Sequence, residues 1–185
     1  MLRMYFALSL LAVTFVAQAS AQNHHPRVGH EANPAVTGAS PYADLESRTV
    51  KALSDQQVAD LRAGRGMTLA LAAELNGYPG PSHVLELADA LQLSADQKER
   101  AAGLLAAMKS ETAFIGGEVI AGETELDRVF ADRIVTRESM EALVARIAAA
   151  QGQLRTAHLR YHLTMMEILS PDQRAGYSRL RGYVR

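Results

Sequence analysis

The sequence contains no cysteine and no tryptophan, and aromatic residues make up only 5% of its 185 residues. Without cysteine the chain forms no disulfide bond, offers no thiolate ligand to a metal, and has no site for a lipid-modified cysteine. It also lacks the apolar–polar alternation typical of strands, and it contains no HExxH motif, nucleophile elbow or phosphate-binding loop. The sequence therefore predicts an all-α protein with an aliphatic core that is not an enzyme.

The first 21 residues have the three parts of a secretory signal peptide. Arg3 supplies the positive charge, residues 4–16 form an apolar stretch, and Ala19-Ser20-Ala21 is a cleavage sequence. The apolar stretch is shorter than the ~20 residues that a membrane-spanning helix needs, although retention as an uncleaved anchor is the alternative. We therefore expect a periplasmic protein with no membrane span after cleavage.

Charge is distributed unevenly along the chain, whose formal net charge is only −1. From Arg146 onward there are seven arginines but only two acidic residues, Glu167 and Asp172, so this part is basic and the rest is acidic. A nearly neutral chain is not typical of nucleic-acid-binding proteins. The asymmetry favours packing of the two parts within one chain or between subunits, or a surface for acidic partners.

Composition divides the remaining chain into an arm and two helical regions. Residues 22–43 contain Pro, Gly, Asn and Ser without apolar periodicity, which predicts a disordered arm. Residues 44–81 predict short helices over 55–63 and 68–75. Residues 82–185 predict the main helical domain, whose first helix is expected to be capped by Ser82 and to run through Leu91.

Two long stretches of the main domain repeat apolar residues in steps of three and four. The first follows Ser94 and the second follows Thr136, a candidate N-cap, with a break between them near residue 133. Two such seams joined by a short turn predict a long antiparallel helical hairpin with short capped helices beside it. Three glycines in the first arm either let it bend or allow a neighbouring helix to approach closely; they are Gly116, Gly117 and Gly122.

A Leu-Ser-x-x-Gln pattern occurs three times, and its spacing is that of a helix capping box. The Ser hydroxyl accepts a hydrogen bond from the N–H three residues later, and the Gln side chain reaches back to the N–H of the Ser. The three copies are Leu53-Ser54 with Gln57, Leu93-Ser94 with Gln97, and Leu169-Ser170 with Gln173.

Two of these copies flank the predicted hairpin, and in this the sequence resembles the Spy/CpxP family of periplasmic stress proteins. The hallmark of that family is a twice-occurring Leu-Thr-x-x-Gln (LTxxQ), here with Ser94 and Ser170 in place of Thr. The zinc-associated ZraP proteins and the periplasmic heavy-metal sensors share this organisation. The resemblance covers residues 85–183 and implies a non-enzymatic, bent, cradle-like dimer. Such proteins hold unfolded clients, bind metal ions in heavy-metal resistance, or report envelope stress to a sensor protein.

A cluster near the end of the second arm is the candidate metal site. His158 and His162 are four residues apart and therefore share one helical face, with Met165 and Met166 about one turn further on. Two imidazoles and a thioether suit Zn, Cu, Ni or Co in a protein without cysteine. The alternative is that the cluster only packs, because His158 and Met165 also lie on the apolar seam.

A helical pair offers too few ligands for a complete site. Glu167, His83 or a partner subunit would have to supply the others. A second histidine group, His24, His25 and His30, lies on the predicted arm and is either an accessory metal site or polar disordered sequence.

These observations favour a periplasmic metal or envelope-stress protein that binds a transition metal through the histidine cluster and forms a homodimer. The alternatives are an ATP-independent chaperone for unfolded proteins, or a regulator that docks on a stress-sensor protein. In the chaperone alternative the histidine–methionine cluster is only part of the core.

Overall fold

The structure, a computed structural model, describes residues 40–183, which form one compact unit. These residues are helical and contain no strand, which confirms the predicted all-α class. In chain order the elements are the 3-10 helix η1 (Ala43–Ser47) and the α-helices α1 (Asp55–Arg62), α2 (Leu71–Glu74), α3 (Pro81–Glu86), α4 (Ala95–Ala131), α5 (Arg137–Ile168) and α6 (Pro171–Leu180). The predicted signal peptide, nearly all of the predicted arm and the histidines at 24, 25 and 30 lie outside the described residues.

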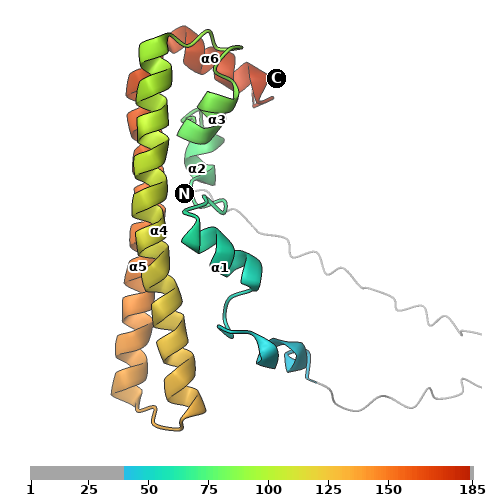
Figure 1. Ribbon diagram of the computed structural model, residues 1–185, viewed down its shortest axis with the longest axis vertical. Helices are drawn as coiled ribbons and strands as arrows, with labels where there is room; N and C mark the ends of the chain where they lie inside the picture. The colour runs from blue at the N-terminus through green and yellow to red at the C-terminus, as the bar shows by residue number, and fades with distance from the viewer. Residues whose placement is uncertain (1–39, 184–185) are drawn as a thin grey trace, which may run out of the picture. The chain divides into compact units, whose positions relative to one another are not determined.

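Helices α4 and α5 form the predicted long hairpin and lie side by side along their lengths (Figure 1). The apolar steps in the two sequences bury residues such as Val119 on α4 and Leu154 on α5, which are 2% and 4% exposed. Thr136 caps α5 as predicted, since its hydroxyl accepts a hydrogen bond from the N–H of Ser139. The shorter helices α1 and α3 contact α4, while α2 and α3 contact α5.

All three predicted capping boxes are present, and two of them touch each other. The side chains of Gln97 and Gln173 exchange hydrogen bonds, from Nε2 of Gln97 to Oε1 of Gln173 (2.8 Å) and in the reverse direction (3.0 Å). Nε2 of Gln97 also donates to the carbonyl of Ile168 (2.8 Å). The amide pair thus joins the first turn of α4 to the first turn of α6 and to the end of α5.

Replacing Gln97 by Ala is expected to lower the free energy of unfolding by about 1–2 kcal/mol, because one cap contact and three cross-helix hydrogen bonds are lost. Gln57 is the matched control, since it closes the same kind of box on α1 but is exposed and makes no cross-helix hydrogen bond among residues 40–183. Urea denaturation of both variants tests this. Equal losses for Gln97→Ala and Gln57→Ala would show that the amide pair contributes nothing beyond capping.

Two of the glycines of α4, Gly116 and Gly122, allow neighbouring elements to approach closely. A Cβ built on Gly116 would lie 2.5 Å from the carbonyl oxygen of Leu61 on α1, and one on Gly122 would lie 2.7 Å from Cγ1 of Ile147 on α5. Gly117 has open space around it, and α4 continues as one helix through all three glycines. Of the two interpretations left open by the sequence, close packing of neighbouring elements therefore holds at Gly116 and Gly122.

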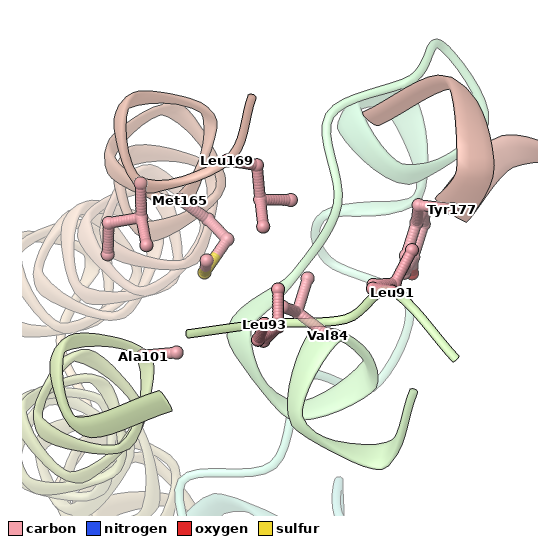
Figure 2. Close-up of a cluster of buried hydrophobic side chains, with 8 residues drawn as sticks. Val84, Leu91, Leu93, Ala101, Met165, Leu169 and Tyr177 are labelled. Atoms are coloured by element: carbon pink, nitrogen blue, oxygen red, sulfur yellow. The ribbon is translucent and has the colours of Figure 1, made fainter. Parts of the chain in front are cut away.

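The main apolar cluster lies where α3, the start of α4, the end of α5 and α6 meet (Figure 2). Its members are Val84, Leu91, Leu93, Ala101, Met165, Ile168, Leu169 and Tyr177. The leucines that precede the second and third capping boxes belong to it, so each box anchors a helix start to the core. A second cluster joins Leu61 of α1 to Val119, Ala150 and Leu154 of the hairpin.

Two predicted helix boundaries were wrong. The helix expected over 68–75 is limited to α2, because Met67 and Thr68 have φ values of 40° and 65°, which a right-handed helix does not allow. The helix expected to start after a Ser82 cap begins instead at Pro81, with Gly80 as its N-cap, and it ends at Glu86 rather than Leu91. Turns fill the remaining residues, and Gln92 has a φ of 51°.

No helix within residues 40–183 combines the length and the apolar character that a membrane crossing requires.

Candidate functional site

A pocket of about 530 Å³ lies beside the hairpin, between the turn that follows α1 and the C-terminal end of α6. The turn at residues 64–68 and the segment from α2 to α3 form one part of its wall. Met108 and Lys109 of α4 and the two histidines of α5 form another. Arg181 and Tyr183 complete the lining at the C-terminal end.

His158 contributes a buried ring nitrogen without a hydrogen-bond partner. The residue is 2% exposed, and its Nδ1 lies 3.0 Å from the carbonyl oxygen of Leu154. A carbonyl only accepts hydrogen bonds, so Nδ1 carries the proton and the neutral ring has its lone pair on Nε2. Nε2 is buried and has no partner among the described residues. Leaving such an atom unpaired costs about 1–3 kcal/mol, which makes it a candidate ligand atom.

His162 lies one helical turn further along α5 and lines the same pocket. Its Nδ1 donates to the carbonyl of Tyr78 (2.6 Å), and the ring is 8% exposed. The Nε2 lone pair is therefore also left for another partner. A Cβ on Gly80 would lie 2.9 Å from Nε2 of His162, so only a glycine at this position leaves the ring its space. In metal sites a backbone carbonyl commonly holds the second ring nitrogen of a histidine ligand in this way.

The turn opposite the histidines is conformationally strained. Met67 and Thr68 are consecutive non-glycine residues with positive φ, and Thr68 is β-branched. The hydroxyl of Thr112 lies 3.2 Å from the carbonyl oxygen of Gly64 at the start of this turn and 2.7 Å from that of Met108, so its one proton is shared between the two. Backbone strain of this kind persists only where the surroundings enforce it, and it is concentrated at binding sites.

Glu74, at the end of α2, is a buried carboxylate at the edge of the pocket and is 6% exposed. It accepts hydrogen bonds from the hydroxyl of Tyr177, from the hydroxyl of Tyr183 (3.0 Å) and from the N–H of Gly80 (3.2 Å). Nε of Arg181 lies 3.8 Å from the carboxylate and offsets its charge. Burial, and then the hydrogen bond to Glu74, raise the pKa of the Tyr177 hydroxyl, which therefore stays a donor.

Sequence reasoning missed Glu74, although a signal was present. It is the only charged residue in the apolar stretch Met67–Leu75, and an isolated acid in such a stretch must either face solvent or find partners. Its two tyrosine partners lie more than 100 positions away in the chain. Nothing local in the sequence indicated that they would meet.

The predicted metal-site residues are not all in one place. His158 and His162 line the pocket together, whereas Met165 is fully buried in the apolar cluster of Figure 2 and Met166 is half-buried outside the pocket. The methionines that line the pocket are two other residues, Met67 and Met108, of which Met67 also packs against the second apolar cluster.

The residues expected to complete the ligand set also separate. His83 lines the pocket, with its Nδ1 3.1 Å from a carboxylate oxygen of Glu86, while Glu167 is exposed and lies outside it. Within residues 40–183 no group of three or more His, Cys, Asp or Glu side chains is arranged to hold a metal ion. Any metal in this pocket therefore depends on the two histidines and on ligands of another kind.

No protein-family model matches this sequence, and comparisons with curated proteins and with solved structures likewise give no match.

Proposed function

We propose that this protein is an exported, non-enzymatic protein of the periplasm that binds a transition metal ion and acts in metal or envelope-stress handling. One observation carries the proposal: His158 and His162 line one pocket from successive turns of α5, and each has Nδ1 tied to a backbone carbonyl. Each ring therefore offers Nε2 as a ligand atom. A pair of histidines four residues apart on a helix is a recurrent metal-binding arrangement.

The residues of the site fit a metal in three respects. The Nε2 atom of His158 is buried and unpaired, the tautomer of both rings is fixed, and both lone pairs belong to the same pocket. Zn, Cu, Ni and Co all accept imidazole nitrogen. Periplasmic export is supported by the N-terminal sequence, and stress handling and homodimer formation rest on the resemblance to the Spy/CpxP family.

A chaperone function is the second candidate, and it has its own support. Several large apolar side chains on the hairpin are exposed, among them Phe114 (73%), Leu163 (55%) and Val144 (49%). Exposed apolar surface of this kind can bind unfolded segments or a second subunit. On this hypothesis the protein suppresses aggregation of a reduced test protein, and chelators have no effect.

Calorimetric titration of the metal-free protein with Zn(II), Cu(II), Ni(II), Co(II) and Cu(I), the last under reducing, oxygen-free conditions, tests metal binding. To keep the arm from contributing, all titrations use a background in which His24, His25 and His30 are replaced by Gln. We expect saturable binding that falls at least about tenfold in both His158→Gln and His162→Gln. His83→Gln, on the rim of the same pocket, is the control and should bind normally.

If none of these ions binds more tightly than it binds free histidine, the metal function is wrong. The chaperone assay then becomes the decisive experiment. Circular dichroism of each variant distinguishes loss of a ligand from loss of the fold.

A further inference from the structure

The free donor atoms of the pocket are soft or borderline, whereas its carboxylate is already occupied. Glu74 accepts three hydrogen bonds and lies close to Arg181, so it is not available as an oxygen ligand without breaking these contacts. What remains are the Nε2 atoms of His158 and His162, together with the side chains of Met67 and Met108. His83 also lines the pocket, but its Nδ1 lies 3.1 Å from a carboxylate oxygen of Glu86, and no three His, Cys, Asp or Glu side chains within residues 40–183 are arranged to hold a metal ion. Thioethers are soft ligands that favour the soft ion Cu(I), and imidazole also binds copper.

The charge of the lining also favours an ion of low charge. Arg65 is paired with Asp60 (2.5 Å), and Arg181 faces Glu74, which leaves Lys109 as an excess positive charge on the wall. The repulsion between a fixed charge and a bound ion scales with the charge of the ion, so Cu(I) is opposed half as strongly as a divalent ion. Cu(I) also accepts two or three ligands, which suits a site where, within residues 40–183, no three His, Cys, Asp or Glu side chains converge.

The positions of the two methionines support a role in binding. Met108 is 8% exposed and lies on α4, the helix that faces the histidines across the hairpin. Met67 lies in the strained turn on the other side, where its φ of 40° is costly for a non-glycine residue. Neither methionine is near the histidines in the sequence, so only the tertiary structure brings the four side chains to one pocket.

We propose that the metal bound in this pocket is Cu(I), held by Nε2 of His158 and His162 and by the thioether sulfurs of Met67 and Met108. This inference rests on the proposed metal-binding function. It names the ion, and it assigns the sulfur ligands to Met67 and Met108 rather than to Met165 and Met166.

Competition with the chromophoric Cu(I) chelator bicinchoninate, under reducing and oxygen-free conditions, tests the proposal. All measurements use the full chain in which His24, His25 and His30 are replaced by Gln. We expect one Cu(I) to bind per chain. The affinity for Cu(I) should fall at least about tenfold in Met108→Leu and in Met67→Leu, because losing a ligand should cost no less than losing a contact that supports a ligand. Leucine nearly conserves the volume of methionine, so the fold should survive. Met165→Leu, in the apolar cluster, is the matched control and should bind as the unsubstituted protein does.

X-ray absorption of the Cu(I)-loaded protein gives a second measurement that needs no variant. We expect sulfur in the first coordination shell of copper, and fewer sulfur ligands in Met108→Leu than in the unsubstituted protein. A shell of nitrogen and oxygen alone would overturn the proposal, as would Met165→Leu weakening binding as much as Met108→Leu. If divalent ions bind through the histidines and the methionine variants change nothing, the proposed function stands and the copper inference fails. If no ion binds at all, both fail.

Discussion

Replacing Gly116 by Ala is expected to lower the free energy of unfolding by about 1–3 kcal/mol, the range typical of an overpacked core. The added Cβ would lie 2.5 Å from the carbonyl oxygen of Leu61 and 3.0 Å from its carbonyl carbon. These are backbone atoms of α1, and they cannot move aside as the end of a flexible side chain can. The whole helix α1 would have to shift away from α4, which opens the cluster around Leu61 and Val119.

Gly117→Ala is the matched control, because it makes the same chemical change one residue further along the same helix. Nothing lies within 4 Å of a Cβ at Gly117. Alanine should therefore stabilise the helix by about 0.5–1 kcal/mol through its better helix propensity. Urea denaturation of both variants measures the two effects, which are expected to have opposite signs. A stabilising Gly116→Ala would mean that α1 does not pack against α4 as described.

Tyr177→Phe is expected to destabilise the protein by about 1–3 kcal/mol, although it removes only one oxygen atom. Tyr177 is fully buried, and its hydroxyl donates to the buried carboxylate of Glu74. The variant leaves this carboxylate with fewer donors in a site that water reaches poorly. Tyr161→Phe is the control, because the Tyr161 hydroxyl donates to the more exposed Glu111 (2.8 Å) and its loss should cost less than about 1 kcal/mol.

The pH dependence of stability separates the hydrogen bond from simple packing. The folded-state pKa of Tyr177 is raised above the ordinary tyrosine value of about 10. Its contribution to stability is therefore complete below about pH 10 and is lost as the pH rises from there toward the folded-state pKa, because the unfolded chain ionises first. Denaturation at alkaline pH should show a shallower loss of stability in Tyr177→Phe than in the unsubstituted protein. Equal slopes would place the effect of the substitution in packing alone.

Local sequence patterns predicted those features that depend on neighbours along the chain. A capping box joins residues three positions apart, and an apolar seam joins residues three or four apart. The starts of α1, α4, α5 and α6 and the pairing of the two long arms were therefore predictable. The predicted starts at Thr68 and Ser82 were wrong, because Met67 and Thr68 have positive φ and because the next helix begins at Pro81 after Gly80.

The make-up of the pocket depends on contacts between residues that are far apart in the chain. The sequence indicated His158 and His162 because they share a helical face, but it grouped them with Met165, which instead faces the apolar cluster. Met67 and Met108 reach the pocket from a strained turn and from the other arm of the hairpin. Glu74 meets Tyr177 across 103 positions of the chain, and His162 meets the carbonyl of Tyr78 across 84. No local pattern encodes such pairs, because they form only when helices that are individually predictable pack in one particular arrangement.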